Sequence, residues 1–179
     1  IPTLYINQLI SSLNRYMIIK FPAGEQSKSL KEYQRIISIM QENNVSRDAC
    51  IIALGGGVTG DLSGFIASTY MRGIDYIQIP TSLLAQIDSS VGGKVAINTE
   101  LAKNSIGQFY SPSLVLIDPI TLQTLDERQF NNGMAEMIKY GMIHSLNLFE
   151  EIETQNIKEN LEHFIYESLS IKKYYVEND

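Results

Sequence analysis

The segment Gly55–Asp61 (GGGVTGD) has the residue types of a phosphate-binding turn. It follows an apolar run and precedes a helical pattern, and the spacing Gly55-x-Gly57-x-x-Gly60 matches a dinucleotide-binding fingerprint. Glycine lets the backbone approach a phosphate, and the start of a helix offers free N–H groups and the positive end of the helix dipole. The segment therefore predicts nucleotide or phosphate binding. The alternative is a tight turn that requires positive φ.

A standard Rossmann site also needs an acidic residue at the carboxyl end of the next strand, where it holds the ribose. Asp75 follows the glycines at a suitable separation, but it begins the apolar run 74–80 instead of ending it. The pattern therefore indicates either a non-standard nucleotide site or an accidental match.

A second polar segment, Asp88–Lys94 (DSSVGGK), is followed by Lys103 and Asn104. Lysine side chains suit an anion, whereas aspartate and asparagine suit hydroxyl groups. These residues predict a site for a small, phosphorylated polyhydroxy ligand. The alternative is an ordinary solvated surface loop.

Glu136 and Lys139 are three residues apart, on one face of a helical pattern. They are either a metal-binding carboxylate beside a substrate-binding lysine or a weak surface ion pair. The two histidines, His144 and His163, match no zinc motif, so we expect packing or surface roles for both. Cys50 lies in an apolar run and is expected in the core.

The elements that must position these residues alternate between strand and helix in the first part of the chain. Apolar runs predict strands over 16–21, 49–54, 74–80 and 113–118, and helical periodicity predicts helices over 27–43 and 59–71. This alternation favours an α/β fold with a mainly parallel sheet. From Asp126 onward the patterns are only helical, with helices expected over 134–152 and around 157–169. We therefore expect an α/β domain over 1–125 and the first helices of a second domain over 126–179.

Composition restricts the class of protein. Apolar residues make up 44% of the chain and charged residues 19%, which is enough for a core, and the net charge is −6. This balance argues against a general nucleic-acid or membrane-surface binder. A single cysteine excludes an internal disulfide framework. We find no signal-peptide pattern and no apolar run near the ~20 residues of a spanning helix, so we expect a cytoplasmic protein.

Several separate segments together resemble the 3-dehydroquinate synthase family. They are GGGVTGDLSGFIAS (55–68), MRG (71–73), IPTSLLAQIDSSVGGKVAIN (79–98), KNSIGQFYSP (103–112) and GMAEMIKYG (133–141). The resemblance implies a Rossmann-like NAD-binding domain followed by a helical domain. It also implies an enzyme of the shikimate pathway that uses NAD and a divalent metal, zinc or cobalt, and acts as a homodimer.

The implied reaction converts 3-deoxy-D-arabino-heptulosonate 7-phosphate, a sugar phosphate, into 3-dehydroquinate and phosphate. The resemblance places substrate-contacting, catalytic residues at Asp88, Lys94, Asn104, Lys139 and Arg72, with Arg72 reaching across the dimer interface, and the first metal ligand at Glu136. It places cofactor contacts at Gly24, Glu25, Gln26, Lys28, Gly57, Val58, Thr59, Gly60, Asp61, Thr81, Ser82, Lys94, Lys103, Thr121, Leu122, Gln123 and Thr124.

One departure from the family is large. The family completes its metal site with two histidines in a motif resembling NLGHTFGH, which this chain lacks. We therefore expect a fragment that binds NAD weakly and does not turn over alone. Alternative interpretations are another sugar-phosphate cyclase such as 2-deoxy-scyllo-inosose synthase, a metal-dependent polyol dehydrogenase, or a non-catalytic nucleotide-binding module. Every interpretation as an enzyme requires Gly57 and Glu136 to border a common site.

Overall fold

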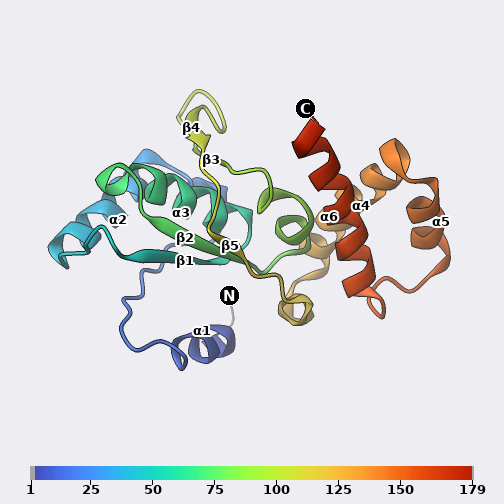
Figure 1. Ribbon diagram of the computed structural model, residues 1–179, viewed down its shortest axis with the longest axis horizontal. Coiled ribbons are helices and arrows are strands. Elements are labelled where there is room, and N and C mark those ends of the chain that lie inside the picture. Colours follow the sequence, from blue (N-terminus) through green and yellow to red (C-terminus); the bar gives the residue numbers. More distant parts are fainter. Residues whose placement is uncertain (1–2, 179) are drawn as a thin grey trace.

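A computed structural model describes residues 3–178. Its α/β part and its helical part lie side by side along the long axis (Figure 1). The helices are α1 (Thr3–Ile10), α2 (Leu30–Glu42), α3 (Gly57–Thr69), α4 (Glu127–His144), α5 (Leu146–Thr154) and α6 (Leu161–Asn178). The strands are β1 (Cys50–Gly55), β2 (Asp75–Pro80), β3 (Lys94–Ile97), β4 (Ile106–Phe109) and β5 (Leu114–Val115).

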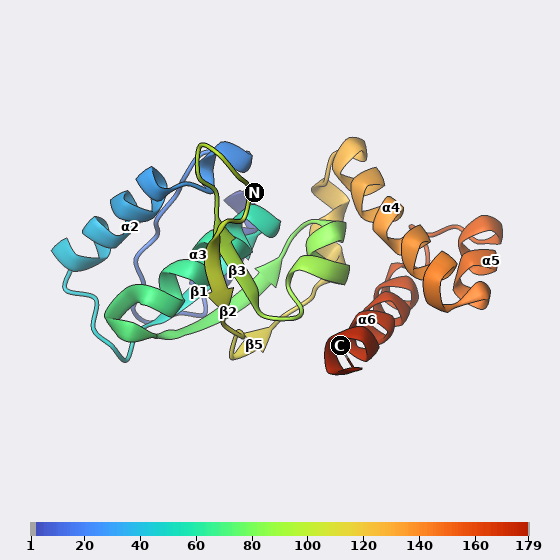
Figure 2. The same ribbon diagram turned by 90° about the horizontal axis from the view of Figure 1, so that it is seen from above.

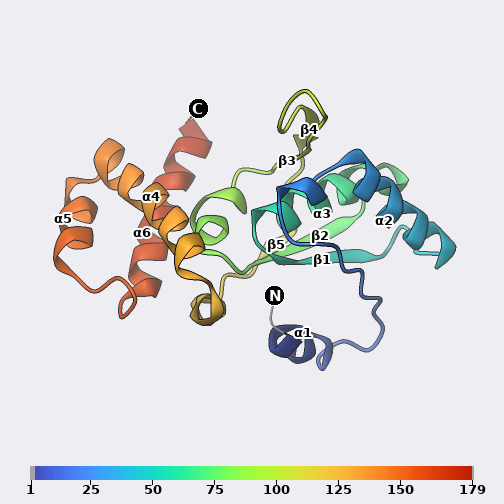
Figure 3. The same ribbon diagram turned by 180° about the vertical axis from the view of Figure 1, so that it is seen from behind.

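The central sheet is parallel, as the sequence predicts, with strand order β1-β2-β5. β1 and β2 pair over their full length, and Gly55 is opposite Pro80, so their carboxyl ends lie together. Helices α2 and α3 lie on one side of the sheet and α1 on the other (Figures 1 and 3). This arrangement brings the glycine turn after β1 next to the polar segment after β2.

The segment 16–21 is not a strand, so this prediction was wrong. Ile19 and Phe21 still pack against the core, but the backbone of the segment is irregular. The carbonyl of Lys20 accepts a hydrogen bond from the Arg35 guanidinium on α2 at 2.8 Å. A side chain thus satisfies a backbone group that a strand would pair in a ladder.

The polar segment after β2 is more ordered than a loop. A π-helical turn, η3 (Ala85–Ser89), carries Asp88, and β3 and β4 then form an antiparallel hairpin. Val95 and Ile97 are buried against α3 while Lys94 is exposed. Burial alternates along 94–97, as expected for a strand with one face on the core.

The helix expected over 134–152 is two helices. Asp126 caps α4, with its carboxylate accepting from the Gln129 amide at 2.9 Å, so α4 begins well before residue 134. Ser145 ends α4, and its hydroxyl accepts from the Leu148 amide at 3.2 Å as the N-cap of α5. Asp179, the last residue of the expected second domain, lies outside the described residues.

Two hydrophobic clusters form the core. One lies between α2, α3, the sheet and β3; the other joins Leu83 and Ile87 near η3 to α4, α5 and α6. The strand 113–118 shortens to two paired residues, and Cys50 is exposed at the start of β1, which contradicts its expected burial. Among residues 3–178, no helix combines the length and apolarity that crossing a bilayer demands.

Candidate functional site

The glycine turn forms the end of β1 and the first residues of α3. Gly56 is the N-cap and Gly57 the first helical residue, two positions before the predicted start. A Cβ on Gly57 would lie 3.0 Å from Ser89 Oγ, and a Cβ on Gly56 would lie 3.2 Å from Ser82 Oγ. Neither residue has positive φ. Close approach therefore explains these glycines, and the alternative of a turn that requires positive φ was wrong.

Asp88, on η3, is held by side chains from two distant helices. Its Oδ1 accepts from Tyr140 Oη on α4 at 3.1 Å and from Lys172 Nζ on α6 at 2.7 Å. Burial and the neighbouring Asp88 carboxylate raise the pKa of Tyr140. Tyr140 therefore stays protonated at neutral pH and donates, which keeps Asp88 as the acceptor.

Lys28 and Asp61 form an ion pair beneath the glycine turn. Lys28 is only 4% exposed, although lysine is rarely buried without a partner. Burial raises the pKa of Asp61, and the hydrogen bond from Lys28 opposes that rise. Glu25 lies 3.9 Å from the same ammonium, so the upstream segment and the first turn of α3 share one electrostatic cluster.

Gly57 and Glu136 belong to one continuous set of contacts. Gly57 faces Ser89 of η3, and the neighbouring Asp88 binds Tyr140, which is four residues after Glu136 on α4. Figure 2 shows η3, in green, between α3 and α4. The contacts connect the glycine turn to α4 through η3, and a ligand site shared by Gly57 and Glu136 stays a prediction. A pocket of about 550 Å³ lies elsewhere, between residues 15–21, β1 and α2, and the predicted site residues do not line it.

Further expected cofactor residues follow β2 and β5. Thr81 follows β2, and its amide donates to the Gly55 carbonyl at 2.9 Å. The 3-10 helix η4 (Pro119–Thr124) carries Thr121, Leu122, Gln123 and Thr124, of which the first two are buried. Gln86 links η4 to η3, because its Nε2 donates to Thr121 Oγ1 at 3.1 Å and to the carbonyls of Pro80 and Asp118.

The structure leaves several expected residues apart from this set. Lys103 and Asn104 lie in the loop between β3 and β4, and Lys94 is exposed on β3. Arg72 follows the carboxyl end of α3, whereas Gly57 begins this helix. A helical rise of 1.5 Å per residue therefore puts Arg72 about 20 Å from Gly57 along the chain. Met71 and Arg72 both have positive φ, which is unfavourable for residues other than glycine.

Comparison with known proteins places the chain in a family. The 3-dehydroquinate synthase N-terminal model matches residues 18–132, and the C-terminal model of the same enzyme matches 133–179. The chain belongs to the 3-dehydroquinate synthase family. A 3-dehydroquinate synthase from Clostridium perfringens is 54% identical over 90% of the chain and 47% of its own length. One from Pseudoalteromonas translucida is 48% identical over 100% and 52%.

The chain thus spans about half the length of the curated 3-dehydroquinate synthases that it matches. Among solved structures, a 2-deoxy-scyllo-inosose synthase complexed with carbaglucose-6-phosphate, NAD+ and Co2+ is 30% identical with a TM-score of 0.87, covering 97% of this chain and 50% of that one. A maleylacetate reductase from Agrobacterium tumefaciens, 17% identical with a TM-score of 0.64 over 93% and 51%, shows a similar fold alone.

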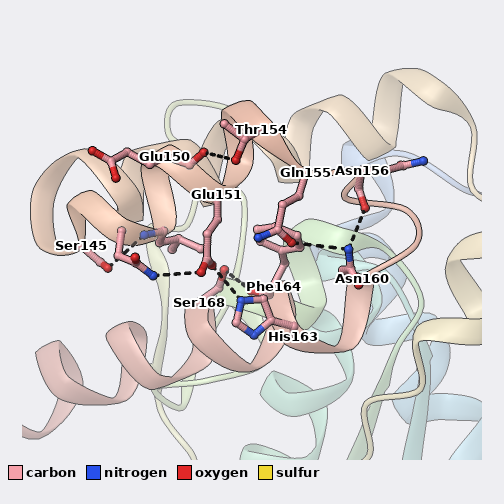
Figure 4. Close-up of polar contacts among 12 residues, drawn as sticks. Ser145, Glu150, Glu151, Thr154, Gln155, Asn156, Asn160, His163, Phe164 and Ser168 are labelled. Atoms are coloured by element: carbon pink, nitrogen blue, oxygen red, sulfur yellow. Dashed lines mark hydrogen bonds and ion pairs between the residues drawn. The ribbon is translucent and has the colours of Figure 1, made fainter.

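Against this family background, the residues present fit NAD but do not complete a metal site. The glycine turn lets the backbone approach a pyrophosphate, and the first backbone amides of α3, which have no partner within the helix, can donate to it. Glu136 pairs with Lys139, and residues 3–178 contain no group of three His, Cys, Asp or Glu side chains that could hold a metal. His144 packs against Tyr174 and Tyr175, and His163 binds Glu151 between α6 and α5 (Figure 4).

Three residues of the contact set could not be predicted as such from the sequence of this 3-dehydroquinate synthase homologue. Lys172 lies beyond every motif, next to another lysine on a helical pattern, and nothing in its local spacing marks it. Tyr140 directly follows Lys139, and its hydroxyl in a helix of otherwise apolar buried residues was the available signal. Gln86 is fully buried, which its polar side chain would not suggest.

Proposed function

We propose that the full-length protein is a 3-dehydroquinate synthase. It would convert 3-deoxy-D-arabino-heptulosonate 7-phosphate into 3-dehydroquinate and inorganic phosphate in the shikimate pathway. The observation that carries the proposal is the identity of 48–54% to curated 3-dehydroquinate synthases, against 30% to a solved 2-deoxy-scyllo-inosose synthase. The contacts that join the glycine turn, η3 and α4 support it.

NAD is the proposed cofactor, and the turn from Gly57 to Asp61 would hold its pyrophosphate. When bound, NAD supplies a hydride acceptor and then returns the hydride, so the overall reaction is not a net oxidation. Asp61 lies one turn into α3, and Lys28 fixes its carboxylate. Gly24, Glu25, Gln26, Thr81, Ser82, Lys94, Lys103 and the segment Thr121–Thr124 are proposed to contribute further contacts.

The substrate would bind next to η3 and α4. Asp88 is an acceptor with fixed orientation and suits a substrate hydroxyl, while Lys139 and Lys172 provide positive charge for an anion. Lys94 and Asn104 would contact the same ligand from the hairpin. Arg72 is too far from the turn of its own chain, so we propose that it completes the site of a partner in a homodimer.

A divalent cation, zinc or cobalt, is proposed with Glu136 as one of its ligands. A solved cyclase with 30% identity is complexed with NAD+ and Co2+, and another with 32% identity binds NAD+ and Zn2+. A single carboxylate does not make a site, because such metals take three or four protein ligands. The other ligands are therefore proposed to lie outside the described residues.

We further propose a cytoplasmic enzyme whose α/β domain covers 1–125.

Turnover of the full-length protein tests this proposal. With the heptulosonate phosphate, NAD and a divalent metal, it should release inorganic phosphate and 3-dehydroquinate in equal amounts, without net accumulation of NADH. Stoichiometric NADH would instead indicate a polyol dehydrogenase. Turnover of a hexose 6-phosphate without formation of dehydroquinate would indicate a cyclase of the 2-deoxy-scyllo-inosose type.

A further inference from the structure

One asparagine joins the proposed cofactor segment to the loop that carries Asn104. Asn98 follows β3 and is half-buried. Its Nδ2 donates to Glu25 Oε1 at 2.8 Å, and its Oδ1 accepts from the backbone amide of Asn104 at 2.8 Å. Its own amide donates to the Lys28 carbonyl at 2.8 Å. Both ends of its amide group and its backbone therefore have partners.

The geometry at Asn104 shows why this link matters. Asn104 has a φ of 53°, in the left-handed region, so the loop needs a local interaction to hold this conformation. Asn98 Oδ1 supplies that interaction across the loop. Within the loop, the hydroxyl of Thr99 accepts from the Ala102 amide at 3.2 Å and shares a hydrogen bond with Ser105. The loop is thus internally closed, and Asn98 fixes it to the rest of the molecule.

The other end of the link lies in the ion cluster beneath the glycine turn. Glu25 accepts from Asn98 and lies 3.9 Å from Lys28, which pairs with Asp61 at the start of α3. A change in the position of Glu25 therefore reaches the loop through one hydrogen bond. Strand pairing reinforces this connection, because Ser29 and Asn98 form an isolated parallel bridge.

We propose that Asn98 is a positioning residue that couples the cofactor segment Gly24–Lys28 to the Asn104 loop. Binding of NAD at the segment would order the loop before the sugar phosphate arrives. This inference rests on the proposed function, in which the segment contacts NAD and Asn104 contacts substrate. Asn98 itself is assigned no contact with either ligand.

A pair of substitutions tests the link without removing side-chain volume. Asn98→Asp keeps the acceptor for the Asn104 amide, but it loses the donor to Glu25 and sets two carboxylates together. Glu25→Gln in that background restores a donor, because the side-chain amide introduced at position 25 can donate to the carboxylate introduced at position 98. We expect Asn98→Asp to raise KM for the sugar phosphate about tenfold, with a smaller effect on kcat. Glu25→Gln alone keeps the acceptor for Asn98 and sets the baseline for the double variant, because Glu25 is itself a proposed NAD contact. The double variant should match Glu25→Gln, and a double variant about tenfold worse than Glu25→Gln would overturn the proposal.

Hydrogen exchange of the full-length protein gives a readout that does not depend on turnover. NAD should slow exchange over residues 99–105 in the wild type, should fail to do so in Asn98→Asp, and should do so again in the double variant. Equal protection of the loop by NAD in all three, or no protection in the wild type, would refute the coupling. Absence of dehydroquinate formation by the wild type would refute the proposed function separately. Asn147→Asp is the matched control, because Asn147 also donates to a glutamate, Glu151, at 3.0 Å on α5.

Discussion

Lys172 Nζ donates to Asp88 Oδ1 at 2.7 Å although 84 residues separate them. The bond connects α6 to the π-helical turn after β2, and the Tyr140 hydroxyl reaches the same oxygen from α4. Both charged side chains are partly buried, so solvent screens the pair less than it screens a surface ion pair. One carboxylate thus fixes the position of both α4 and α6 relative to the sheet.

Replacing Lys172 by methionine should impair the full-length enzyme. The change removes one positive charge beside the proposed phosphate-bearing substrate and frees Asp88 from one of its two donors. We expect kcat/KM for the heptulosonate phosphate to fall at least about tenfold, mainly through KM, as measured by phosphate release. Lys173→Met is the matched control, because that side chain is 69% exposed and pairs only loosely with Glu177. Equal losses in both variants would contradict a specific role for Lys172.

Gly57→Ala should weaken NAD binding while the fold is retained. The new Cβ would lie 3.0 Å from Ser89 Oγ and would occupy the surface where a pyrophosphate approaches. We expect the Kd for NAD to rise about tenfold in calorimetry, with little change in circular dichroism. Ser89→Ala relieves the contact with Ser89 but not the blocked approach, so the double variant should bind as weakly as Gly57→Ala. Recovery in the double variant would show that crowding alone was responsible.

The sequence predicted the parallel sheet and the glycine turn because both rest on local features. The apolar runs 49–54 and 74–80 are bounded by glycine and proline, which mark the ends of β1 and β2 directly. The helix starts were less predictable, since Asp126 and Ser145 act as caps within a pattern that remains periodic across the break. Periodicity alone shows which face of a helix is apolar, but it does not show where one helix ends and the next begins.

The site was predictable only in part, for a different physical reason. The family resemblance supplied Asp88, Glu136 and Lys139, but no spacing links Asp88 to Lys172 on a helix near the other end of the chain. The segment 16–21 has the composition of a strand, yet a strand also needs a neighbour with free backbone groups. Such partners are properties of the folded chain and leave no mark in a local window.

The buried pair Lys28–Asp61 should be harmful to break but tolerant of joint replacement. Asp61→Asn leaves the Lys28 ammonium, which is only 4% exposed, with no carboxylate nearer than Glu25 at 3.9 Å. We expect the free energy of unfolding to fall by about 3 kcal/mol in urea denaturation of the full-length protein. The double variant Lys28→Met, Asp61→Leu removes both charges and should recover most of that loss. If the losses of unfolding free energy in Lys28→Met and in Asp61→Leu added up to the loss in the double variant, the two residues would not be a coupled pair.

The contact between α5 and α6 should make stability depend on pH in the acidic range. His163 Nε2 lies 2.8 Å from Glu151 Oε2 (Figure 4). Asn147 Nδ2 donates to Glu151 Oε1 at 3.0 Å. The hydrogen bond with His163 lowers the pKa of Glu151 below its ordinary value. A carboxyl whose pKa is lower in the folded state stabilises the fold above its unfolded pKa and loses that contribution as the pH falls through its folded pKa.

Glu151→Gln should therefore lower the Tm at about pH 6, and the difference from wild type should shrink as the pH falls below about 4. His163→Ala should show the same window, because it removes the other partner of the same bond. Differential scanning calorimetry of the full-length protein across this range measures both. Glu150→Gln is the control, since the contact that Thr154 makes with Glu150 uses its backbone carbonyl, at 2.8 Å, and survives the change. A difference in Tm that stays constant from neutral to acidic pH would show that packing, not the ionised Glu151, stabilises the contact between α5 and α6.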